Sequence, residues 1–228
     1  MNPTPHFYTY RELQVKADSL TPCQRRTRPS FKTATDFYQV HLLKHTGLSE
    51  FHSFAELLNA GLLEGDHHVI NYVPQPFMVW VGNRRYTPDS YVARDNGPRE
   101  VLELKPRGEF PDAKRDALTQ YLEPHNMVFD VISNESVYAR RLEAENWLEI
   151  VRNLYLARDL DTAQAEQQVM EHVLLEGECP FEDFVDMGDR ESSYPAEIAV
   201  MRLLHRGQLT ANLSDQPFNL DTVLSRCP

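Results

Sequence analysis

Apolar residues follow a helical spacing in two segments between residues 35 and 64, after a first segment without such a pattern. Residues 1–33 are rich in Pro, Thr and Arg and show little periodicity, which indicates an extended arm. The next apolar residues, followed by Gly47, predict a short helix over Thr35 to Lys44. A second helix is predicted over Ser53 to Glu64, where apolar residues return every three or four positions.

The pattern then changes to the two-residue period of strands. Strands are predicted over residues 68–73, 77–81, 85–94 and 99–105, with Gly82-Asn83 and Asp95-Asn96-Gly97 as turns. A helix follows from Pro111 to Leu122, and a fifth strand, rich in β-branched residues, from Met127 to Ser133. A meander followed by a helical crossover predicts an α/β fold with a mixed sheet flanked by helices, over residues 34–135.

The last third, residues 136–228, reads as a separate, mostly helical unit. Helices are predicted over 143–158 and 161–175, and a third opens at Ser193-Tyr194-Pro195 and ends at Gly207. The acidic stretch 176–191 between them reads as a linker or a loop that faces a partner. Short strands at 208–213 and 216–220 complete a winged-helix-like module.

Charge divides the chain unevenly. The 228 residues are 41% hydrophobic and 25% charged, which is typical of a globular protein in water. The net charge of −11 is distributed as +3 over residues 1–50, −5 over 51–135 and −9 over 136–228. This balance argues against a protein that coats nucleic acid by bulk electrostatics. Any DNA contact is expected in the first two thirds, and a protein partner is expected at the acidic last third.

Composition also bears on location and redox state. The chain has no apolar run of about 18 residues and no signal-peptide pattern, so we expect a cytoplasmic protein without a membrane partner. Its three cysteines are far apart, and they fit neither a disulfide framework nor a Cys-rich zinc site. The sequence therefore assigns Cys179 and Cys227 no chemical role.

The most informative chemistry lies on the strands around residue 97. In the strand 99–105, side chains alternate, so Glu103 and Lys105 share one face while Leu102 and Leu104 point to the other. A three-residue loop at 95–97, with Gly97 in the left-handed conformation, would place Asp89 opposite Glu103 on that face; a two-residue loop would place it opposite Leu104. We favour the three-residue loop.

Two converging carboxylates repel each other unless a divalent cation joins them, and hard oxygen ligands favour Mg²⁺, with Mn²⁺ as the substitute. The carbonyl of Leu104 is a plausible third ligand, and Glu56 on the preceding helix could complete the set. Lys105 could orient a water or stabilise developing negative charge. Metal-dependent phosphodiester hydrolysis is the reaction that these roles describe.

Each residue also has a structural interpretation. Ser53-x-x-Glu56 is a capping box, which alone accounts for that glutamate. Pro88-Asp89 could be a turn, and Glu103 with Lys105 an exposed ion pair on an edge strand. These structural interpretations are weakened because the helix, the strands and the acids occur in the order that metal-dependent phosphodiester hydrolysis requires.

That order resembles the PD-(D/E)XK nuclease superfamily, and within it the TnsA-type endonuclease subunit of heteromeric transposases. The resemblance rests on residues 53–106, with these motifs: Ser53-x-x-Glu56, Gln75-Pro76, Tyr86-Thr87-Pro88-Asp89 and Glu103-Leu104-Lys105. It implies a restriction-endonuclease-like sheet, with Glu56, Asp89, Glu103 and Lys105 catalytic and Asp89 and Glu103 holding the metal.

The resemblance also implies a task and partners. Such a subunit cleaves the 5′ ends of the transposon, on double-stranded DNA, while a separate DDE transposase subunit cuts and joins the 3′ ends. Its C-terminal unit contacts an AAA+ ATPase regulator. Arg84 and Arg85 are candidate phosphate contacts, although a solvated turn explains them equally well, and Lys114 and Arg115 are candidates for flanking the DNA.

Two other functions remain open from the sequence. The chain could be an assembly factor built on an idle nuclease fold, with the acidic last third as its working part. It could also be a stand-alone restriction or repair nuclease.

Overall fold

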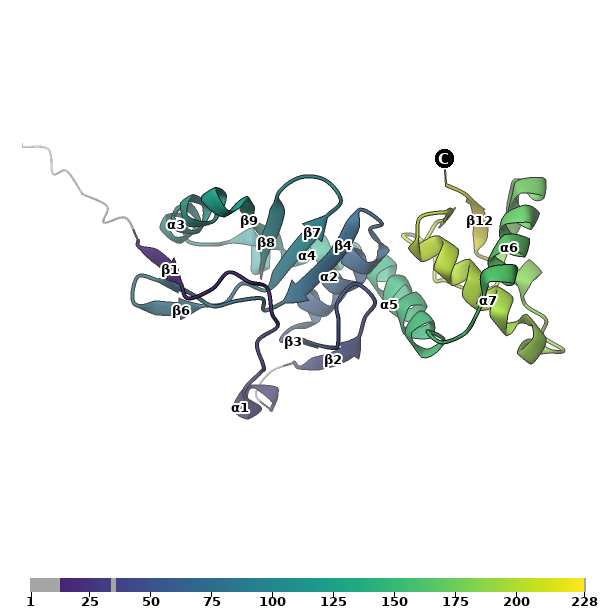
Figure 1. Cartoon of the computed structure of the whole chain (residues 1–228), viewed down its shortest axis with the longest axis horizontal. Helices are drawn as coiled ribbons and strands as arrows, with labels where there is room; N and C mark the ends of the chain where they lie inside the picture. Colours follow the sequence, from purple (N-terminus) through teal and green to yellow (C-terminus); the bar gives the residue numbers. More distant parts are fainter. Residues whose placement is uncertain (1–12, 34–35, 228) are drawn as a thin grey trace, which may run out of the picture.

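A four-stranded sheet forms the centre of the larger unit. The computed structural model describes residues 13–33 and 36–227 (Figure 1). The strand order is β4-β7-β8-β9, and β8 and β9 are parallel while the other pairs are antiparallel. The strands are β4 (Val69–Pro74), β7 (Ser90–Arg94), β8 (Arg99–Lys105) and β9 (Met127–Ser133). The predicted helical crossover between β8 and β9 is confirmed, and the fold is mixed α/β. The predicted meander is only partly confirmed, because the strand predicted over 77–81 does not join this sheet.

The two faces of this sheet are covered by different layers. On one face, α2 (Phe54–Gly65) and α5 (Arg141–Leu156) pack over Leu102. On the other face, α3 (Asp112–Leu122) packs over Val101. Successive residues of β8 therefore enter opposite cores, as the alternation of the strand requires.

A second, smaller sheet lies beside α3. Its strands, in the order β1-β5-β6, are β1 (Val15–Ala17), β5 (Val79–Val81) and β6 (Arg84–Tyr86). The prediction of one strand over 85–94 is therefore wrong, because β6 and β7 belong to different sheets. Pro88 lies between them, and its ring nitrogen has no hydrogen to donate to a ladder.

The N-terminal region departs from its prediction in two places. The described part of the arm is extended but includes β1 and a short helix, α1 (Pro29–Lys32); residues 1–12 lie outside the described part. The helix predicted over 35–44 is wrong, because β2 (Tyr38–His41) pairs there with β3 (Leu48–Phe51). Within β2 the exposure alternates residue by residue, which is the period of a strand.

The last third builds its own core around helices and a small sheet. The helices of this core are α5, α6 (Ala163–Glu176) and α7 (Arg190–His205), whereas α4 (Asn134–Ala139) packs through Val137 against α2. The sheet has the order β10-β12-β11, with β10 (Glu178–Pro180), β11 (Leu209–Ala211) and β12 (Val223–Arg226). The final strand lies at 223–226, so the strand predicted at 216–220 is wrong.

Helix α5 joins the two units, as its position in Figure 1 shows. Val151 belongs to the core under the central sheet, whereas Ile150 and Leu154 belong to the C-terminal core. Gly61 on α2 allows close contact, because a Cβ there would lie 2.5 Å from the carbonyl oxygen of Ala144 on α5. The division of the chain at residue 136 thus falls just before a helix that both cores share.

The acidic stretch 176–191 is not a linker. Its first half forms β10 and the 3₁₀ helix η3 (Phe181–Phe184), and Cys179 and Phe181 are buried in the C-terminal core. The turn that leads into α7 is exposed, as are residues 176–178 and 182–183. The prediction failed because two buried residues among many acids are too few to produce a periodic pattern.

In the described part of the chain, no helix has both the length and the apolar character needed to cross a membrane.

Candidate active site

Asp89 immediately precedes β7, in the register that the three-residue loop predicts. Ser90 faces Leu102 across the β7–β8 ladder, and Gly97 in the loop has φ +91°. The backbone N–H of Asp89 donates to the carbonyl of Leu102 at 3.0 Å. The register prediction is confirmed, and it places Asp89 beside Glu103 at the end of the hairpin.

The carboxylate of Asp89 is not turned into the apolar layer. It accepts a hydrogen bond from the backbone N–H of Leu104 at 2.7 Å. Burial raises the pKa of Asp89 well above its usual range, and the nearby carboxylates of Glu103 and Glu56 raise it further. The Leu104 N–H and the Lys105 ammonium oppose this shift but do not outweigh it.

Glu103 is 3% exposed and has two partners. The hydroxyl of Tyr86 donates to its Oε2 at 2.6 Å, and the ammonium of Lys105 lies 2.5 Å from its Oε1. Burial lowers the pKa of Lys105, but Glu103 and the more distant Asp89 and Glu56 raise it more, so the net shift is upward. Lys105 therefore stays protonated at neutral pH beside a buried carboxylate.

Glu56 lies in the first turn of α2 and closes the predicted capping box. Its backbone N–H donates to Ser53 Oγ at 3.2 Å, and Ser53 Oγ donates to Glu56 Oε1 at 2.9 Å. The capping interpretation of this residue is confirmed as a description. Glu56 also lines a small cavity of about 10 Å³ together with Asp89 and Leu104. That volume is close to what one water needs.

Gln75 connects Glu56 to the strand that carries Asp89. Its side-chain amide donates to Glu56 Oε2 at 2.9 Å, and its backbone N–H donates to the carbonyl of Asp89 at 3.0 Å. It is buried, and its φ of 40° lies in the left-handed region, a strained conformation that proteins concentrate at functional sites. The sequence assigned no role to Gln75 or Tyr86, although both lie inside the quoted motifs.

Among the four basic residues proposed for DNA, Lys114 lies nearest to the acids. Its ammonium is 3.4 Å from the centroid of the Tyr86 ring. The pKa of Lys114 is lowered, chiefly by burial. Glu103 and Asp89 oppose this shift and Lys105 adds to it, so all three residues are close enough to affect the ammonium. Arg84, Arg85 and Arg115 are exposed outside this group, and the Arg85 guanidinium lies over the ring of Trp80 at 5.0 Å.

The three acids are close but do not form a compact ligand set. Glu56 is held by its cap and by Gln75, Asp89 by the Leu104 N–H, and Glu103 by Tyr86 and Lys105. In residues 13–33 and 36–227, the one group of three metal-ligating side chains with all ligand atoms within 4.8 Å is elsewhere: His172, Cys179 and Asp183. A metal at the acids would therefore have to replace the present partners of Glu103 or Asp89.

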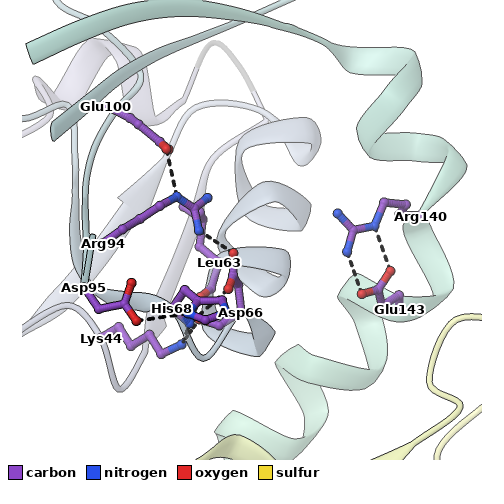
Figure 2. Close-up of polar contacts among 9 residues, drawn as sticks. All are labelled: Lys44, Leu63, Asp66, His68, Arg94, Asp95, Glu100, Arg140 and Glu143. Atoms are coloured by element: carbon purple, nitrogen blue, oxygen red, sulfur yellow. Dashed lines mark hydrogen bonds and ion pairs between the residues drawn. The ribbon is translucent and has the colours of Figure 1, made fainter. Parts of the chain in front are cut away.

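A larger cleft of about 660 Å³ lies on the opposite face of the sheet from Glu103, between Leu102, Ile132 and α5. Figure 2 shows its charged groups paired among themselves. Arg94 bonds to Asp66 and, at 2.8 Å, to Glu100, while Arg140 pairs with Glu143 at 2.6 Å. Because both guanidiniums are already neutralised, this cleft offers little to an anionic ligand, and the acids around Asp89 are the stronger site.

No protein-family model matches the chain, and no curated protein matches its sequence.

Proposed function

We propose that this chain is a metal-dependent DNA endonuclease of the PD-(D/E)XK type, and that it serves as the TnsA-like subunit that cleaves the 5′ ends of a transposon. The observation that carries the proposal is the placement of Asp89 beside Glu103 and Lys105, with Glu56 opening onto the same small cavity as Asp89. The order of α2, the strands, α3 and β9 supports a restriction-endonuclease-like core.

The donor set suits Mg²⁺ or Mn²⁺. Asp89, Glu103 and the Leu104 carbonyl would hold the ion, with Glu56 directly or through a water, and all of these are oxygen ligands. Burial raises the pKa of Asp89 most, and the carboxylates of Glu103 and Glu56 raise it further; a bound cation would oppose this shift. When bound, the metal would activate a water and neutralise charge on the phosphodiester.

The protein's own side chains have separate roles in this proposal. Lys105, once its ion pair with Glu103 is loosened, can orient the attacking water or stabilise the negative charge that develops on the phosphate. Tyr86 holds Glu103 in place, and Gln75 holds Glu56. Lys114, next to Tyr86, is placed to meet a DNA phosphate, and Arg84, Arg85 and Arg115 would act farther along the DNA.

The C-terminal unit is proposed as the partner-binding part, with a winged-helix-like arrangement of α6, α7 and the small sheet. Its surface carries acidic residues together with exposed apolar side chains, including Leu175 at 84% exposure and Met187 at 69%. Apolar groups among charges are typical of protein interfaces. This combination supports contacts with an AAA+ ATPase and a DDE transposase, and it is also what an assembly factor with an idle nuclease fold would need.

The test is cleavage of plasmid DNA carrying the element's ends, by the purified chain with Mg²⁺ and by the chain combined with the proteins encoded beside it. Asp89→Ala and Lys105→Ala should abolish cleavage while complex assembly survives. Asp95→Ala, an exposed acid on the same hairpin, is the matched control and should be neutral. Unchanged cleavage by Asp89→Ala would reject the nuclease proposal and favour the assembly factor; robust cutting by the isolated chain would favour a stand-alone nuclease.

A further inference from the structure

Three metal-ligating side chains meet in the C-terminal unit, far from the acids around Asp89. His172 lies near the end of α6, Cys179 on β10, and Asp183 on η3. The chain reverses direction between the first two at Gly177, whose φ of +80° is one that glycine adopts readily. This reversal brings residues 7 and 11 positions apart in the sequence together in space.

Their ligand atoms already lie at near-coordinating separations. All three are within 4.8 Å of one another, and His172 Nε2 is 3.1 Å from Asp183 Oδ2. Two such ligands around a tetrahedral zinc are about 3.3 Å apart, and a sulfur would be about 3.6 Å from each. A side-chain shift of no more than about 1 Å would therefore complete the geometry.

We propose that His172, Cys179 and Asp183 bind a Zn²⁺ ion, with a water or a partner's group as the fourth ligand. Sulfur, imidazole nitrogen and carboxylate oxygen are the donors that zinc takes in proteins. Mg²⁺ is excluded by this set, because it prefers oxygen ligands and octahedral geometry. The proposal is independent of the nuclease function.

The surroundings favour a cation at this point. Cys179 is 3% exposed, and the carboxylate of Asp183 offers an oxygen within 4.8 Å of its sulfur. A bound cation would be the largest local charge between these two ligands.

The cluster also has an entrance. His172 and Asp183 line an open hollow of about 530 Å³, which gives the ion a path and leaves a coordination position facing solvent. Cys179 and Phe181 anchor the other side in the core. A metal here would tie α6 to β10 and η3, and so fix the acidic segment that the sequence suggested as a partner-facing loop.

The test uses the full chain, stripped with a chelator and kept reduced, and titrated with Co²⁺ and then Zn²⁺ in excess Mg²⁺. Thiolate ligation gives an intense charge-transfer absorption with Co²⁺, which an all-oxygen site does not give. We expect one equivalent of Co²⁺ with this absorption, displaced by Zn²⁺. Cys179→Ser should remove the absorption and weaken Zn²⁺ binding at least about 100-fold, since even outer-shell losses cost about 10–100-fold.

His172→Ala and Asp183→Asn change partly exposed side chains, so they test the site even if Cys179→Ser folds poorly. Both should weaken Zn²⁺ binding. Cys227→Ser, a cysteine outside the cluster, is the control and should leave it unchanged. Absence of the thiolate absorption in the unmodified chain, or Zn²⁺ affinity that survives the His172 and Asp183 substitutions, would overturn the proposal.

Discussion

Two groups of polar residues in the molecule differ in geometry: the Asp89 site (Glu56, Asp89, Glu103 and Lys105) and the Cys179 cluster (His172, Cys179 and Asp183). In the Asp89 site, adjacent strands set the arrangement, and each acid has its own hydrogen-bond partner. In the Cys179 cluster, three elements converge and the ligand atoms lie together. The first has three carboxylates and a lysine paired with one of them; the second combines sulfur and nitrogen with one carboxylate.

This difference separates two kinds of function. A catalytic metal site needs open coordination positions and a nearby group that can act on the substrate, and Lys105 fits that second requirement. A structural metal site joins ligands from separate elements, as a metal held by α6, β10 and η3 would. Under the two proposals, the two units of the chain would bind different metals for different purposes.

The largest expected effect is on DNA cleavage, and it distinguishes Mg²⁺ or Mn²⁺ at the Asp89 site from Zn²⁺ at the Cys179 cluster. Removing all divalent ions should lower cleavage by about 10³-fold or more, because both water activation and charge neutralisation are lost. Mg²⁺ or Mn²⁺ should restore cleavage and Zn²⁺ alone should not. Initial rates on plasmid DNA, measured after chelation and stepwise return of each metal, check this.

Cys179→Ser should cleave at the rate of the unmodified chain in the same assay. If that variant, shown to be folded by circular dichroism, loses cleavage as fully as Asp89→Ala, the two sites are not independent and the comparison fails.

A second prediction concerns the contact between the two units. Gly61→Ala should destabilise the protein by about 1–3 kcal/mol, because the new methyl group would overlap the carbonyl oxygen of Ala144 on α5. Alanine normally stabilises a helix relative to glycine. A lower free energy of unfolding in Gly61→Ala would therefore reflect the contact with α5 and not helix propensity. Urea denaturation measures the free energy of unfolding.

Thr119→Ala, on the exposed face of α3, is the helical control and should change stability by less than about 0.5 kcal/mol. If Gly61→Ala raised the free energy of unfolding, α2 and α5 would be able to move apart without loss of stability.

The Asp89 site was more predictable from sequence than the Cys179 cluster, for a physical reason. Strand alternation and loop length fix which side chains share a face, so Asp89, Glu103 and Lys105 could be placed from local pattern alone. The β7–β8 register and the parallel β9 were predictable in the same way. The roles of Tyr86 and Gln75 were not, because Tyr86 reaches Glu103 from the second sheet and Gln75 reaches Glu56 on a helix packed against the central sheet.

The failures have a common cause in tertiary structure. The helix predicted over 35–44 is wrong at Tyr38 and Val40 because their strand is short and its pairing partner, β3, carries no distinctive pattern. Cys179 was given no role because nothing local connects it to His172 or Asp183. Convergence of three elements depends on packing around Phe181 and the end of α6, which periodicity does not encode.

The smallest expected effect tests the charge balance of the Asp89 site directly. The pKa of Asp89 is raised in the folded protein, so this residue favours folding below its unfolded pKa of about 3.9 and that contribution is lost as the pH rises through the folded value. At pH 7 its charge should therefore oppose folding. Asp89→Asn keeps an oxygen for the Leu104 N–H and should stabilise the metal-free protein by about 1 kcal/mol at pH 7, with no gain near pH 3.5.

Glu50 should affect the pH dependence of stability in the direction opposite to Asp89. Burial would raise its pKa, but hydrogen bonds from Lys32, Thr27 and Gln39 lower it to about 2, so Glu50 stabilises the fold above its unfolded pKa and loses that contribution as the pH falls toward 2. Glu50→Gln should thus destabilise at pH 7 where Asp89→Asn stabilises, with both read from urea denaturation at pH 7 and pH 3.5. Destabilisation by Asp89→Asn at pH 7 would mean that its neighbours already compensate its charge. The Asp89 site would then lack the excess negative charge that distinguishes a metal-binding group from an ordinary buried acid.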